Sequence, residues 1–183
     1  MILPIAVIGH PVLRKKAKEI DSTYPNINTL IDNMFETMVN ANGVGLAAPQ
    51  VGKSIQLIVI DATPMAEDDP TVEGFKIVLI NPKLLEAGTE VEPYNEGCLS
   101  IPGFNEDVLR PNNIKLEYYD ADFVKHTEDF EGLKARIIQH EMDHLQGILF
   151  SDRLSAIKRQ LSKNKLVAIS KGKFERNYKV SLS

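Results

Sequence analysis

The stretch that decides the fold is Gln139-His140-Glu141-Met142-Asp143-His144-Leu145. Histidines four positions apart on a helix are separated by about 40° around its axis, so His140 and His144 can converge on one metal ion. Glu141 flanks the same face, near the ion but not bound to it. In the alternative interpretation the two histidines merely belong to a buried or solvated helix face. The motif predicts a central metal-binding helix.

The pattern around this motif gives the expected helix its ends. Apolar and motif residues share one face from about residue 130 to 146, with Leu133 and Ile137 on the side of the two histidines. Asp129 is placed to cap the start of the helix, and Gly147 is placed to end it.

A third ligand is needed, because catalytic metal sites commonly use three protein ligands and leave one position for water. One metalloprotease pattern has a glycine three residues after the second histidine and a third histidine three residues further on. Here Gly147 fits that pattern, but the last position is Phe150. Another metalloprotease pattern takes its third metal ligand from a glutamate on a later helix, and Glu175 is the only glutamate downstream of His144. Both patterns therefore fit this sequence poorly.

Cys98 is the remaining candidate ligand, within Glu96-Gly97-Cys98-Leu99-Ser100-Ile101-Pro102. A soft thiolate is a good ligand for zinc or ferrous iron, and the preceding glycine permits a tight backbone approach. The thiol could instead be a small core residue or a nucleophile paired with a histidine. Because the chain has one cysteine, it cannot form an internal disulfide, and a reducing compartment fits.

A third segment, Gly43-Val44-Gly45-Leu46-Ala47-Ala48-Pro49-Gln50, combines small residues with one amide side chain. Two glycines and two alanines suit a place where another backbone comes close. Gln50 offers an amide donor at its end. On its own, the segment favours the simpler interpretation of a pair of turn glycines and a surface glutamine.

The other expected elements lie on both sides of these motifs. An amphipathic helix is expected over 25–42, with Gly43 closing it, and strands over 55–60, 76–81 and 114–119. Residues 64–70 read as an exposed loop. A last helix is expected over about 154–166, with Leu154, Ile157 and Leu161 facing inward. The fold class is therefore α+β, with antiparallel or mixed sheets around the central helix and a further helix near each end.

Composition and charge narrow the class of protein. A chain of 183 residues with 43% apolar residues suits one globular domain. The opening MILPIAVIGH lacks a basic region and a long apolar run, and no later run reaches about 18 apolar residues, so no membrane segment is expected. The net charge is −4, yet residues 151–183 carry nine Lys or Arg against two acids. This basic end is either a solvated surface or a contact to polyanionic RNA.

The three segments together resemble the peptide deformylase family, whose signatures are a glycine-rich stretch ending in Gln, an EGCLS segment and a QHExDHL helix. They occur here in the same order, at 43–50, 96–100 and 139–145. The opening at 9–14, GHPVLR, is also similar, so the resemblance covers about residues 3–165. It implies one catalytic domain over 1–166, followed by a basic tail over 167–183.

The resemblance also implies roles for residues of the site. Cys98, His140 and His144 would hold one divalent metal, Fe²⁺ in cells, with Zn²⁺, Ni²⁺ or Co²⁺ tolerated in a purified sample. Glu141 would act as proton acceptor and donor, and negative charge on the tetrahedral oxygen would be met by the metal, the Gln50 amide and the Leu99 backbone N–H. Glu96 is similar to the family's acidic residue that supports the metal ligands without binding the metal, and Arg110 would be its ion-pair partner.

The implied substrate is an N-formylmethionyl peptide of a nascent chain, which loses its formyl group as formate. In the family the substrate lies extended along the protein, near Val44, Gly45 and Leu46 and near the stretch that begins at Gly103. Further residues expected to line the pocket for methionine are Leu133 and Ile137. The chain departs from the family's best-known enzymes at Asn105, where they carry an arginine.

The expected setting is a cytoplasmic monomer with no membrane or DNA contact. The basic last helix resembles the one by which related enzymes approach the ribosome. Two rival functions stay open at this point. One is another hydrolase on the same motif, such as an aminopeptidase, and the other is a binding module whose metal is structural or lost.

Overall fold

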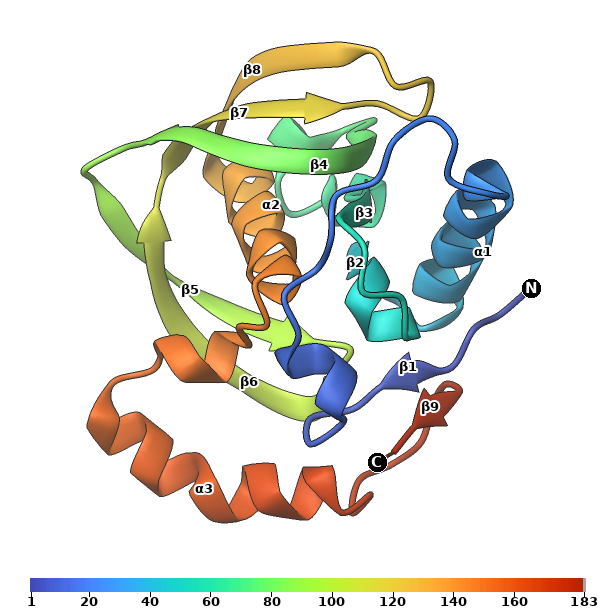
Figure 1. Cartoon of the computed structure of the whole chain (residues 1–183). Coiled ribbons are helices and arrows are strands. Elements are labelled where there is room, and N and C mark those ends of the chain that lie inside the picture. The colour runs from blue at the N-terminus through green and yellow to red at the C-terminus, as the bar shows by residue number, and fades with distance from the viewer. Residues whose placement is uncertain (183) are drawn as a thin grey trace.

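A computed structural model describes residues 1–182, and Ser183, the last residue of the expected basic tail, lies outside the described part. Helix α2 (Gly132–Leu145) runs through the middle of the molecule, between a five-stranded sheet and a long hairpin (Figure 1). Its apolar side chains, among them Leu133, Ala135 and Ile138, are buried in one core cluster with the sheet. The predicted α+β class with a central helix is confirmed.

The five-stranded sheet is antiparallel, in the order β2-β3-β4-β7-β8. Strand β3 begins with four consecutive apolar residues, and all four are buried because both faces of the strand are covered. Ile58 and Ile60 face the core cluster that contains α2, whereas Leu57 and Val59 face the cluster that contains α1. The strands are β2 (Gly45–Ala47), β3 (Leu57–Asp61), β4 (Lys76–Ala87), β7 (Asn113–Tyr119) and β8 (Lys125–Glu131).

A second sheet is a hairpin of β5 (Val91–Cys98) and β6 (Ile101–Pro111), which the sequence did not predict. Its strands contain Pro93, Asn95, Gly97 and other residues that are rare in strands, so the local pattern is weak. The hairpin matters for the site because Cys98 is the last residue of β5.

Helix α1 (Ile27–Asn40) confirms the helix expected over 25–42, but it is shorter at both ends. Asn42, with φ of 55°, takes the left-handed position expected for Gly43. Gly43 is needed for a different reason, since a Cβ there would lie 2.7 Å from Leu99 Cδ1. The glycine lets the chain approach the segment that contains Cys98.

The start of α2 differs from the prediction. Asp129 and Phe130 belong to β8, and Glu131 precedes the helix without a side-chain cap, so the predicted Asp129 cap is wrong. Gly132, with φ of 57°, makes the turn from strand to helix. Gly147 follows the end of the helix as expected, with φ of 72°. Short 3-10 turns lie at Pro11–Arg14, Ala48–Val51, Thr63–Met65, Pro70–Val72 and Phe150–Arg153.

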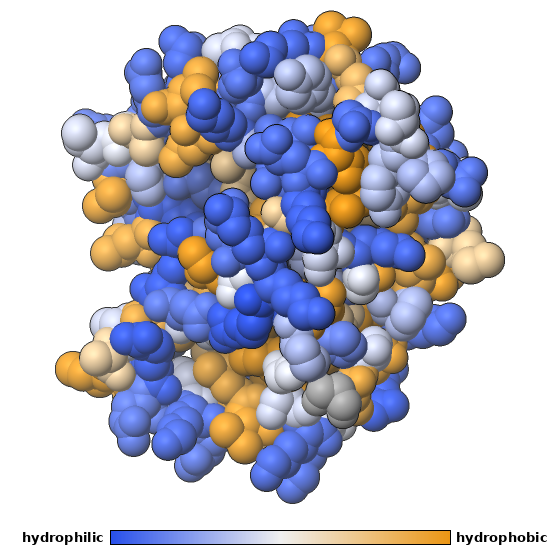
Figure 2. Space-filling view, viewed as in Figure 1, coloured by the Kyte–Doolittle hydropathy of each residue, from blue (hydrophilic) through white to orange (hydrophobic). Residues whose placement is uncertain are grey.

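Helix α3 (Ala156–Ser170) lies along one edge of the molecule (Figure 1). It extends beyond the predicted end near residue 166, and its N-cap Ser155 accepts a hydrogen bond from Lys158 N–H. Leu154 is buried as predicted, but Ile157 and Leu161 are 74% and 79% exposed, so their predicted inward orientation is wrong. Figure 2 shows apolar side chains among hydrophilic ones along this edge.

The chain after α3 turns back and packs against the N-terminus. Strand β9 (Val180–Ser181) pairs in parallel with β1 (Ile5–Ala6), so strands near the two ends of the chain lie side by side (Figure 1). No helix within residues 1–182 is long and apolar enough to cross a membrane.

Candidate active site

Cys98, His140 and His144 meet at the centre of the molecule. The thiol comes from the end of β5, and both imidazoles come from α2. One ligand atom of each residue lies within 4.8 Å of the others, and Cys98 Sγ is 3.3 Å from His144 Nε2. The fold thus brings together the three residues that the sequence predicted as metal ligands. Among residues 1–182 no fourth His, Cys, Asp or Glu joins the group.

The chemistry of this group fits a divalent transition metal. His140 Nδ1 is 2.9 Å from Glu96 Oε2, which leaves Nε2 free to coordinate. Burial and the neighbouring His140 hold the pKa of His144 well below its usual value, so this imidazole is neutral and able to bind a cation. A cysteine sulfur and two imidazole nitrogens suit zinc or iron, and three protein ligands leave one coordination position open.

A buried ionic network holds these ligands in place. Arg110, 2% exposed, donates to both oxygens of Glu96, at 2.6 and 2.9 Å, and to Asp143 Oδ2 at 2.8 Å. Arg136 donates to Glu96 Oε1 at 3.0 Å. Although burial opposes ionisation, Arg110 and His140 hold the pKa of Glu96 far below its usual value. The predicted Glu96–Arg110 pair therefore forms, and the prediction missed Asp143 and Arg136.

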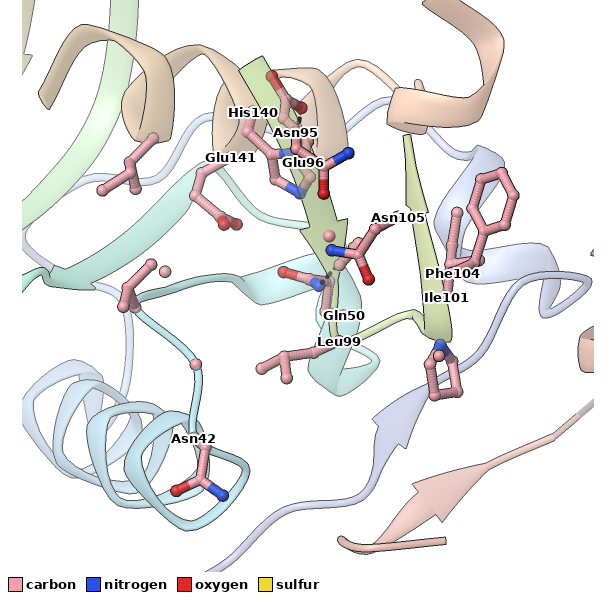
Figure 3. A pocket seen from close by; sticks show the side chains of 18 of the residues that line it. Asn42, Gln50, Asn95, Glu96, Leu99, Ile101, Phe104, Asn105, His140 and Glu141 are labelled. Carbon is pink, nitrogen blue, oxygen red and sulfur yellow. Dashed lines mark hydrogen bonds and ion pairs between the residues drawn. The ribbon is translucent and has the colours of Figure 1, made fainter. Parts of the chain in front are cut away.

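Glu141 lies next to His140 in the pocket (Figure 3). It is 4% exposed, and its Oε2 has no hydrogen-bond partner among the described residues. Burial raises the pKa of Glu141 to about 7. A Cβ at Gly45 would come 2.5 Å from Oε1, so a larger residue there would displace this carboxylate. The group can therefore accept and return a proton.

Gln50 and Leu99 lie on the other side of the site from His140 and Glu141 (Figure 3). Gln50 Oε1 accepts from Ala47 N–H at 2.8 Å, which directs Nε2 toward Ser100 Oγ at 3.1 Å and Cys98 Sγ at 3.7 Å. The Leu99 backbone N–H donates to no backbone or side-chain acceptor within residues 1–182. Both groups are donors that a reacting oxygen can use.

A cleft of about 680 Å³ opens beside the three ligands. Among the expected substrate-binding residues, Val44, Gly45, Gly103, Leu133 and Ile137 line it. Leu46 does not, because its side chain is fully buried in the core. Strand β2 is at the edge of its sheet and leaves its outer side free for an added strand. Residues that the prediction missed also line the cleft, namely Tyr94, Phe104, Phe174, Glu175, Asn177 and Tyr178.

Comparison with known proteins agrees with this geometry. A family model described as "Polypeptide deformylase" matches residues 2–160. A protein named "Peptide deformylase" from Christiangramia forsetii is 52% identical, covering 98% of this chain and 95% of the relative. One of the same name from Flavobacterium psychrophilum is 49% identical, covering 100% and 97%.

Solved structures give the same result. The crystal structure of peptide deformylase from Thermotoga maritima is 40% identical, with a TM-score of 0.77, covering 85% of this chain and 99% of that one. A peptide deformylase from Legionella pneumophila is 35% identical, with a TM-score of 0.82, covering 96% and 99%. The chain therefore belongs to the polypeptide deformylase family.

Proposed function

We propose that this chain hydrolyses the amide C–N bond that links the formyl group to the N-terminal methionine of nascent polypeptides, releasing formate. Its family acts on formylmethionine. The observation that carries the proposal is the group formed by Cys98, His140 and His144, with the unpartnered carboxylate of Glu141 beside it. The rival binding module is disfavoured because a structural site commonly has four protein ligands.

Cys98, His140 and His144 would hold one divalent cation. Fe²⁺ is proposed as the cellular ion, and Zn²⁺, Ni²⁺ or Co²⁺ are compatible with the same donors in a purified sample. When bound, such an ion supplies Lewis-acid chemistry that polarises a carbonyl and acidifies water. Glu96 fixes the orientation of the His140 ring through Nδ1, and Arg110 fixes Glu96.

Glu141 is proposed as the general base and then the general acid. Its buried carboxylate can take a proton from the attacking water and give it to the departing amine nitrogen, so that the protons balance over the cycle. The Gln50 amide and the Leu99 N–H are proposed to stabilise the negative charge that develops on the formyl oxygen. The Gln50 amide is anchored by the Ala47 N–H, and Leu99 lies in the turn between β5 and β6.

The peptide is proposed to bind as an extended strand against the free edge of β2. Val44 and Gly45 would supply contacts there, and Gly103 in β6 would face the opposite side of the peptide. Leu133 and Ile137 would contact the methionine side chain. Main-chain pairing is indifferent to side chains, which suits an enzyme that acts on many nascent sequences.

The proposed setting is a cytoplasmic monomer that meets its substrates at the ribosome through α3. This helix exposes Arg159, Lys163 and Lys165, while Lys158 is half-buried with its Nζ 2.7 Å from Glu106 Oε1. A contact between these four cations and RNA phosphates would weaken as salt rises. Cosedimentation with ribosomes at increasing salt, with and without these four side chains, tests this contact. Binding that does not change after the charges are removed contradicts it.

Glu141→Gln provides the decisive test of the chemistry. The variant keeps the shape of the side chain and all three ligands, so we expect normal metal content and a loss of about 10²- to 10⁴-fold in kcat for formate release from formyl-Met-Ala-Ser. Glu131→Gln, just outside α2, is the control with the same chemical change. Retained turnover in Glu141→Gln contradicts the assigned role, and release of free amino acid by the wild type favours the aminopeptidase.

A further inference from the structure

The C-terminal segment reaches the cleft from outside the residues that the family model matches, which end at 160. Gly172, with φ of 76°, reverses the chain after α3, and β9 then fixes the segment beside β1. Between these two points Phe174, Asn177 and Tyr178 line the cleft. The end of the chain is therefore part of the site rather than a separate appendage.

Tyr178 makes a direct contact with the segment that contains Cys98. Its hydroxyl donates to the Leu99 carbonyl oxygen at 2.6 Å, and its ring packs on the same core cluster as the Leu99 side chain. Burial raises the pKa of Tyr178 to about 12, so the hydroxyl keeps its proton as a donor. The next residue, Lys179, accepts a hydrogen bond from Ile5 N–H at 2.9 Å, so the backbone beside Tyr178 is anchored to β1.

The contact acts on a peptide unit next to the thiol. The carbonyl of Leu99 and the N–H of Ser100 belong to one planar peptide group. Ser100 N–H donates to Cys98 Sγ at 3.4 Å, and the Ser100 carbonyl accepts from Ile8 N–H at 2.8 Å. The Tyr178 hydroxyl and the Cys98 thiol therefore hold opposite ends of one rigid plane. The Leu99 N–H belongs to the preceding peptide plane, which is joined to this one at the Leu99 Cα.

We propose that Tyr178 is a positioning residue for deformylation, because its hydroxyl fixes the Leu99–Ser100 peptide and so keeps the Leu99 N–H and the Cys98 sulfur in the arrangement that the reaction needs. The inference rests on the proposed function. It adds to that function a residue from the C-terminal segment, which the three sequence motifs do not contain.

The kinetic test compares Tyr178→Phe with the wild-type full chain. We expect kcat for formate release from formyl-Met-Ala-Ser to fall about two- to tenfold, the worth of one net hydrogen bond, with KM and metal content unchanged. Tyr24→Phe is the matched control, because Tyr24 packs on the same core cluster and its hydroxyl has no hydrogen bond among the described residues. This control should keep the wild-type kcat.

A second readout does not depend on activity. In the metal-free protein, amide hydrogen exchange at Ser100 should be about two- to tenfold faster in Tyr178→Phe and unchanged in Tyr24→Phe. Wild-type kcat or wild-type exchange in Tyr178→Phe overturns the inference and leaves the proposed function intact. Absence of formate release from the wild type overturns the proposed function and the positioning role of Tyr178 together.

Discussion

Replacing Arg110 by leucine tests the claim that a buried ionic network supports the metal ligands. The change removes three charge-assisted hydrogen bonds, two to Glu96 and one to Asp143, at a side chain that is 2% exposed. The carboxylates of Glu96 and Asp143 then stay buried with one cationic partner fewer. We expect the variant to lose metal affinity as well as stability, because Glu96 also orients His140.

The magnitude follows from the partners that remain. Removing one partner of a buried ion pair costs about 3–5 kcal/mol in the free energy of unfolding. Arg136 still donates to Glu96 and Arg153 still donates to Asp143, so we expect the lower half of that range, about 3–4 kcal/mol. For a domain of this size, that loss lowers Tm by about 6–16 °C. Metal affinity should fall about 10- to 100-fold.

The assay is urea denaturation of the metal-free protein, followed by metal titration of the folded protein. Arg153→Leu is the matched control, because it removes a partner of the same Asp143 from a side chain that is 41% exposed, and it should cost about 1 kcal/mol or less. Glu96→Gln added to Arg110→Leu should restore part of the stability, since it removes one uncompensated charge. Equal losses in Arg110→Leu and Arg153→Leu would refute the reasoning.

Three further predictions concern single residues. Gly45→Ala should lower formate release about 100-fold without unfolding the chain, because the new Cβ would displace Glu141 Oε1, which is 2.5 Å away. Gly147→Ala should cost about 1–3 kcal/mol in urea denaturation, since its φ is 72° and a Cβ would lie 2.7 Å from the Arg14 carbonyl oxygen. Burial opposes ionisation of Asp152, but Arg14 holds the pKa of Asp152 below its usual value. Its contribution to stability is therefore present above about pH 4 and is lost on further acidification, a loss that Asp152→Asn should reduce in an acid titration of stability.

Where the sequence failed, the reason was a tertiary contact that local patterns do not contain. The hairpin β5–β6 carries proline, glycine and asparagine inside its strands, and it forms because each strand pairs with the other along its length. Helical periodicity predicted that Ile157 and Leu161 face inward. Instead, the buried residues lie near the two ends of α3, at Leu154 and Ile169. Periodicity shows that a helix has two faces, but not which neighbour is present to cover one of them.

The sequence by itself determined the chemistry: two histidines and a glutamate on one helix, a thiol after glycine, and a glycine-rich segment ending in Gln50. Residue types can be read directly from the sequence. The spacing of residues along a helix fixes which of them share a face, without any tertiary contact. Only the tertiary structure decided that the thiol meets both rings, that Arg110 and Asp143 stand behind them, and that Tyr178 reaches Leu99. Those contacts join residues distant in the chain, and they form because burying the core forces their elements together.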